Sequence, residues 1–223
     1  MQSENKDEQK YIDRAINEAL HPEFEVTKQY LKNNDLELEN GLPKVVRVDM
    51  RLPNGMVGVY LAFKAGFFLE VHLTKLPEPA IDFVYVRSAN TVSFNATSPK
   101  LAYADLAGCL SLKPLSGWSK GENAQNAGLN RMFSKVGYQL FVGESYDLET
   151  QLQLLLTELE KDAAGVLKLT QIGAAYISVY RRQYVSGDTG IHLDAETIRR
   201  LSALNLSVDI DTQIVGTSIA DEN

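Results

Sequence analysis

The sequence predicts an α+β protein in which a mixed or antiparallel sheet is covered by helices, with an N-terminal helical segment and a β-meander ahead of it. Residues 6–33 have a helical pattern in which apolar pairs recur every four residues from Tyr11 to Leu20, and apolar and polar residues alternate between 46 and 74. Strand-like and helix-like patterns then follow one another from about residue 83 onward. Hydrophobic residues form 44% of the 223 residues, so the chain is long and apolar enough to bury a core without disulfides or metals.

Residues 1–40 are expected to form the helical segment. Pro22 lacks a backbone donor and interrupts the helical pattern, which predicts two helices with a break near His21 and Pro22. We expect the apolar stripe of the first helix to pack on the protein's own core. A docking element of a structural accessory subunit is the alternative. The stripe consists of Tyr11, Ile12, Ala15, Ile16, Ala19 and Leu20.

Residues 41–80 are expected to form the meander. Asn54-Gly55 is a strong hairpin signal between two alternating strands, because both residues tolerate positive φ. A third strand runs from Phe67 to Thr74 and places Glu70 and His72 on its polar face. We interpret that face as a solvent-facing polar row, with a carboxylate-oriented imidazole as the alternative. The proline-rich segment 76–80 is the predicted domain boundary.

Residues 81–217 are expected to form the strand–helix α+β domain, and residues 218–223 a flexible tail. The first strand, 83–97, is interrupted near residues 88–90, and residues 114–128 read as a loop. Asp147 and Asp194 are predicted helix N-caps, and Asn205 is expected to end the last helix in the left-handed conformation. The predicted elements are a leucine-striped helix over 148–159, a helix over 163–171, a strand over 174–184, a helix carrying Ile198, Leu201 and Leu204, and a last strand from Leu206.

Three segments of this second part carry a family resemblance. They are Leu110-Ser-Leu-Lys-Pro-Leu-Ser-Gly-Trp-Ser-Lys-Gly-Glu122, the leucine-rich helix 148–159, and the segment from Gly190 to Asp211. With these segments, residues 83–215 resemble an uncharacterised bacterial family, the domain of unknown function numbered four-two-seven-nine. The resemblance implies a bacterial α+β domain and carries no reaction with it.

No pattern of residues indicates a catalytic centre, so we expect no enzymatic activity, no catalytic residues, no metal and no cofactor. The three histidines have no metal-ligand spacing, and neither a phosphate-binding loop nor a nucleophile elbow occurs. Cys109 is the only cysteine, which excludes an internal disulfide and fits a reducing compartment; we expect it to be a packed helical thiol.

The charge balance and the hydropathy of the chain argue against two classes of partner, nucleic acids and membranes. With 22 Lys and Arg against 29 Asp and Glu, the chain has a net charge of −7, which argues against a nucleic-acid partner. No apolar run approaches the roughly 18 residues of a membrane span, and the N-terminus lacks the pattern of a signal peptide. We therefore expect a cytoplasmic protein that binds no membrane.

Five residues are predicted to bind a partner or ligand. Trp118 lies in a Gly/Ser-rich loop beside Lys120 and Glu122, where it is either an interface anchor or a plug at the end of the core. Asp209 and Asp211 share one face of the last strand, which suits either an exposed polar face or a carboxylate site for a cation or acid–base chemistry.

The sequence favours a non-enzymatic bacterial binding protein that acts by protein–protein recognition. A narrower form of this hypothesis is an immunity or antitoxin-like protein that neutralises a basic toxin, because an acidic inhibitor gains association rate against a basic partner. The alternative is an enzyme or small-ligand-binding protein that uses Asp209 and Asp211 together with Glu70 or His72.

Overall fold

Backbone contacts divide the chain into two units, each with its own core. The first unit comprises Met1–Ala89, Arg182–Thr189 and Thr212–Asn223, and the second comprises Asn90–Arg181 and Gly190–Asp211. The structure is a computed structural model, which describes residues 2–52, 55–75, 78–124, 128–140, 147–187 and 190–218. The α+β class predicted from the sequence is confirmed: the described residues form a two-stranded and a four-stranded antiparallel sheet and a five-stranded mixed sheet.

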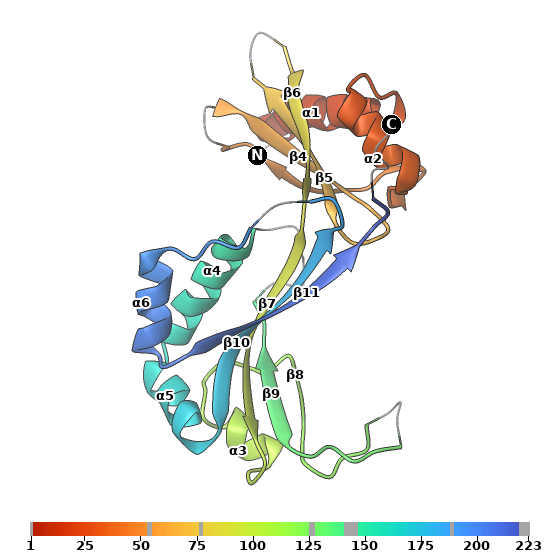
Figure 1. Ribbon diagram of the computed structural model, residues 1–223. Helices are drawn as coiled ribbons and strands as arrows, with labels where there is room; N and C mark the ends of the chain where they lie inside the picture. The colour runs from red at the N-terminus through yellow and green to blue at the C-terminus, as the bar shows by residue number, and fades with distance from the viewer. Residues whose placement is uncertain are drawn as a thin grey trace. The chain divides into compact units, whose positions relative to one another are not determined.

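The first unit combines two helices with a four-stranded antiparallel sheet (Figure 1). The chain breaks between the helices at Pro22, as predicted. The buried carboxylate of Glu18 accepts hydrogen bonds from the backbone N–H groups of Glu23 and Phe24, which fixes the start of the second helix. The helices are α1 (Gln2–Leu20) and α2 (Glu25–Asn33); β1 (Leu38–Glu39) pairs with β2 (Leu42–Pro43); and the sheet order is β3 (Val45–Asp49), β4 (Val57–Ala62), β5 (Phe68–Thr74) and β6 (Ala80–Arg87).

The core of the first unit lies between α1 and one face of this sheet. Tyr11, Ala15 and Ala19 from the predicted apolar stripe are buried against it, so the stripe packs on the protein's own core as expected. The sheet side of the core is formed by residues at alternate positions, as period-two patterning requires: Val57, Val59, Leu61, Leu69, Val71, Leu73, Val84 and Val86.

The second unit is a five-stranded sheet with its helices on one face (Figure 1). In Figure 1, β10 and β11 point in the same direction, which makes the sheet mixed, and α6 lies in the connection between them. The sheet order is β11 (Ser207–Val215), β10 (Ala174–Tyr184), β7 (Ala89–Ser98), β9 (Ser134–Tyr138) and β8 (Ser116–Trp118); the helices are α3 (Tyr103–Ala107), α4 (Leu148–Glu160), α5 (Ala163–Ile172) and α6 (Ala195–Ala203).

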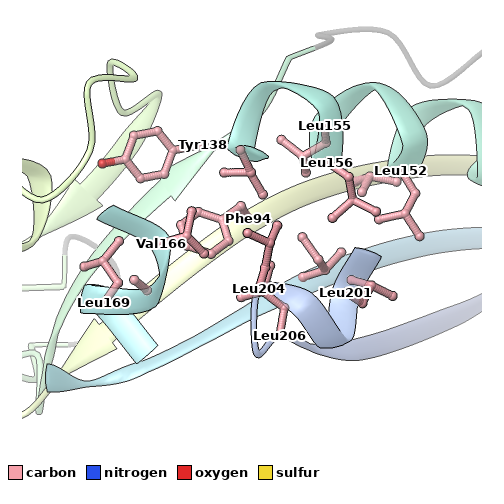
Figure 2. Packing of buried hydrophobic residues seen from close by; sticks show 14 of the residues in the cluster. Phe94, Tyr138, Leu152, Leu155, Leu156, Val166, Leu169, Leu201, Leu204 and Leu206 are labelled. Carbon is pink, nitrogen blue, oxygen red and sulfur yellow. The ribbon is translucent and has the colours of Figure 1, made fainter. Parts of the chain in front are cut away.

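Leucines of α4 form the centre of the second core (Figure 2). Leu152, Leu155 and Leu156 lie over Phe94 of β7, and residues of α5 and α6 complete the cluster. The helix ends follow local rules that the sequence already indicated. Asp147 accepts a hydrogen bond from the N–H of Thr150, Asp194 accepts one from Thr197, and Asn205 has the predicted positive φ of 53°.

Two expectations need correction. The interruption at Ser88 is present, but the strand before it, β6, belongs to the four-stranded sheet of the first unit. The units divide after Ala89 and not at the expected boundary, 76–80. The expected loop 114–128 contains the edge strand β8. Asn54 of the expected hairpin and residues 219–223 of the expected tail lie outside the described residues. None of the described helices is long and apolar enough to cross a membrane.

Candidate functional site

A two-stranded arm extends from the β8–β9 edge of the second sheet. Trp118 of β8 lies opposite Lys135 of β9, and the pairing continues past both strands through hydrogen bonds between backbone groups of residues 121–124 and 129–131. We call residues 115–124 and 128–135 the arm. In Figure 1 it is the green ribbon that leads away from β8 and β9.

Trp118 is held across the base of the arm. Its indole N–H donates a hydrogen bond of 3.0 Å to the carbonyl oxygen of Phe133, and its ring lies 6.2 Å from that of Phe133, centroid to centroid. The guanidinium carbon of Arg131 lies 4.1 Å from the centre of the indole, and Nζ of Lys135 lies 5.4 Å from it. Partial burial lowers the pKa of the Lys135 ammonium. Trp118 is thus a half-buried, oriented ring flanked by two cations, outside the core cluster.

Lys120 and Glu122, the other two predicted binding residues of this segment, fix the arm's backbone. Nζ of Lys120 donates to the carbonyl oxygen of Pro99 at 3.0 Å, and its N–H donates to Oγ of Ser134 at 2.9 Å. Oε1 of Glu122 accepts a hydrogen bond of 2.8 Å from the N–H of Ser119. Both side chains therefore position Trp118, although both remain exposed to solvent.

The arm also presents large apolar side chains that were not among the predicted binding residues. Met132 is 78% exposed and Leu129 is 69% exposed, and Leu115 and Phe133 are exposed as well. The arm and the adjacent Lys113 carry four cationic residues against one carboxylate, Glu122, in a chain that is acidic as a whole. The signal for this surface is present in Leu129-Asn-Arg-Met-Phe-Ser-Lys135, where apolar and basic residues mix directly before a strand. Such a surface suits a partner with an apolar pocket and nearby carboxylates.

Asp209 and Asp211 lie on β11 and are both exposed. Burial, and then the charges of these two carboxylates, raise the pKa of the Tyr176 phenol, which places all three groups near one another on the sheet. Within the described part of the chain, no three His, Cys, Asp or Glu side chains form a cluster that could hold a metal ion. The two carboxylates therefore form an exposed acidic strip on the edge strand.

Glu70 and His72 differ most from expectation. The predicted solvent-facing row is wrong, because Glu70 is fully buried and His72 is 8% exposed. Glu70 accepts a hydrogen bond of 2.6 Å from the Tyr60 hydroxyl and pairs with Nε of Arg87. Nε2 of His72 lies 2.9 Å from Oε1 of Glu70, and the His72 ring stacks on Phe83 with centroids 3.9 Å apart. Side chains of the neighbouring strands, namely Tyr60, Arg87 and Phe83, therefore contact the polar face of β5.

The surroundings of Glu70 keep it ionised. Burial by itself raises the pKa of a carboxyl group, but the approach of His72, the Tyr60 hydroxyl and the Arg87 charge together lower the pKa of Glu70 to about 2. Burial, followed by the charge of Glu70, raises the pKa of the Tyr60 hydroxyl. The four side chains form a neutralised polar cluster that binds β4, β5 and β6 together.

This pKa predicts a loss of stability in acid. A carboxyl group with a lower pKa in the folded state than in the unfolded state stabilises the fold above the unfolded pKa of about 4.3, and this stabilisation disappears as the pH falls toward the folded pKa. We expect the free energy of unfolding, measured with urea, to fall between about pH 5 and pH 2. The fall should be smaller in Glu70→Gln than in the wild type. The exposed-carboxylate control Glu37→Gln should keep the wild-type pH dependence, and equal profiles for both variants would contradict the assignment.

Comparison with known families identifies the region that contains the arm. The family model of DUF4279, described as a domain of unknown function, matches residues 87–215. The chain belongs to the DUF4279 family. No curated protein and no solved structure matches the chain.

The DUF4279 region contains all five binding residues predicted from the sequence. Trp118, Lys120 and Glu122 lie in the arm, and Asp209 and Asp211 lie on β11. Of the Glu70 cluster, only Arg87 falls within the DUF4279 match, at its first residue. The two surfaces that the structure exposes on the second unit are thus features of the DUF4279 domain, whereas the buried cluster belongs to the sheet before it.

Proposed function

We propose that this chain is a non-enzymatic protein-binding module that recognises another protein through the arm. The observation that carries the proposal is the exposed apolar surface around an oriented tryptophan. Interface hot spots are enriched in Trp and Arg, and in the arm Arg131 packs on the Trp118 ring. Trp118 loses little conformational freedom on binding because its hydrogen bond to Phe133 already orients it.

The charges of the arm indicate the chemistry of the partner's contact surface. Lys120, Arg131 and Lys135 lie beside exposed Met132 and Leu129, so the complementary surface is an apolar pocket edged by carboxylates. The immunity or antitoxin-like form of the proposal rests on the net charge of −7, which steers a basic partner toward the chain over long range. In that case the toxin would combine a basic overall charge with an acidic pocket at the contact.

The test is affinity purification of the full chain from its source cell, followed by measurement of the dissociation constant of the purified complex. We expect the wild type to recover a stoichiometric partner. Trp118→Ala and Met132→Asp should each weaken the complex by about 30-fold or more, which corresponds to roughly 2 kcal/mol. Leu154→Asp is the matched control, because Leu154 is exposed on α4, away from the arm. Recovery of the wild type as a monomer only, or wild-type affinity in the arm variants, would overturn the proposal.

A further inference from the structure

The last strand is an edge of the second sheet. Among the described strands, β10 is the only one hydrogen-bonded to β11. The part of β11 in the second unit, residues 207–211, is exposed except for the half-buried Val208. An edge strand presents unpaired backbone N–H and C=O groups to a further strand, and residues 207–211 contain neither proline nor lysine, two residues that commonly block such pairing.

A groove runs beside this edge on the helix-bearing face. It has a volume of about 550 Å³ and lies between α6 and the start of β11. Its lining combines five apolar residues with three polar ones: Leu193, Ile198, Leu201, Leu206 and Val208, with Ser202, Asn205 and Ser207. Ile198 belongs to the apolar stripe of α6 but is 55% exposed, because nothing in the described part of the chain covers it. Val208 packs on the core cluster, so the groove continues the core surface out to the edge of the sheet.

The other face of the same edge is acidic. Alternate residues of a strand point to opposite faces, so Asp209 and Asp211 lie on the face opposite Val208. Their influence on Tyr176 of the neighbouring strand agrees with this placement. The edge thus offers a backbone ladder, an apolar groove on one side and two carboxylates on the other.

We propose that residues 207–211 of β11 accept an extended segment of a partner protein as a sixth strand, in which apolar and basic side chains alternate. Main-chain hydrogen bonds provide affinity in this mode of recognition, and alternate side chains provide specificity. The apolar side chains of the added strand enter the groove beside Ile198, and its Lys or Arg side chains pair with Asp209 and Asp211. This site is separate from the arm and does not depend on the function proposed for it.

Charge disfavours the pairing of β11 with the same strand of a second copy. Antiparallel pairing of two β11 strands about Ile210 would place Asp209 of one copy opposite Asp211 of the other. Like charges at directly opposed positions destabilise a sheet. A basic segment has the complementary charge, so the acidic pair both attracts the proposed partner and disfavours pairing of β11 with itself.

The proposal is tested with a synthetic seven-residue peptide of alternating lysine and valine, added to the full chain and followed by calorimetry and hydrogen exchange. We expect binding together with slower exchange of backbone amides in residues 207–211. Asp209→Asn/Asp211→Asn and Ile198→Asp should each weaken binding by at least about tenfold. Trp118→Ala should bind the peptide like the wild type, which separates this result from the test of the arm. Ile172→Asp, an exposed position at the end of α5, is the matched control for Ile198→Asp.

Three further peptides distinguish strand addition from simple charge attraction. Lysines and valines in two blocks keep the composition but lose the alternation, alternating glutamate and valine reverses the charge, and N-methylated amides remove the backbone donors. All three are expected to bind at least about tenfold more weakly than the alternating lysine–valine peptide. Absence of binding by that peptide, equal binding by the block or N-methylated peptide, or unchanged exchange in residues 207–211 would overturn the proposal.

Discussion

Replacement of Glu70 by alanine is expected to lower the free energy of unfolding by about 2–4 kcal/mol. The substitution removes the acceptor of the buried Tyr60 hydroxyl and leaves the Arg87 guanidinium without its counter-charge. The Arg87 side chain is 46% exposed and can be rehydrated, so the expected cost lies below that of a fully buried broken pair. Glu70→Gln should cost less than Glu70→Ala, because its amide oxygen still accepts from Tyr60.

Glu37→Ala is the matched control for the Glu70 variant. Glu37 belongs to the same unit and pairs with Lys44 at 3.0 Å, but both side chains are exposed to solvent. An exposed ion pair contributes less than about 1 kcal/mol to stability. Urea unfolding followed by circular dichroism measures both variants, and similar losses for Glu70→Ala and Glu37→Ala would show that the buried cluster has no special role.

Replacement of Leu156 by alanine is expected to cost about 2–5 kcal/mol in the second unit. Leu156 is completely buried on α4, where it packs in the cluster around Phe94 (Figure 2). The smaller side chain leaves a cavity that the surrounding leucines fill only in part. The fluorescence of Trp118, the only tryptophan, reports unfolding of this unit directly.

Leu154 provides a control on the same helix and with the same residue type. It lies two positions before Leu156 and is 41% exposed. We expect Leu154→Ala to change the free energy of unfolding by less than about 0.5 kcal/mol, because little buried surface is lost. If both alanine variants shift the tryptophan-monitored transition equally, the assignment of the two faces of α4 is incorrect.

Local sequence rules predicted most elements of this protein. Pro22 separates α1 from α2, and Asp147 and Asp194 cap α4 and α6, because each effect depends only on residues within one helical turn. The strand β10 also has the predicted bounds. These features depend on backbone geometry and short-range hydrogen bonds, so residues close together in the sequence are sufficient to predict them.

The candidate site was only partly predictable. Trp118 was predicted as a binding residue because it is the single tryptophan and lies in a polar segment, but Arg131, Met132 and Phe133 were not predicted. Their role depends on the pairing of residues 121–124 with 129–131, which brings them beside Trp118 across the arm. Similarly, Asp209 and Asp211 were predicted as an exposed strand face or a carboxylate site. The groove beside them exists because α6 and β11 meet in the fold.

The sequence by itself determined which residues of each strand share a face and where most helices begin and end. Only the tertiary structure decided what covers those faces. Glu70 and His72 have the alternation of an exposed polar row, yet the Glu70 carboxylate is buried. Tyr60 and Arg87 from neighbouring strands bind it, and Arg87 compensates its negative charge. Alternation is a property of one strand, whereas burial and charge compensation depend on partners distant in the chain, and no local pattern specifies them.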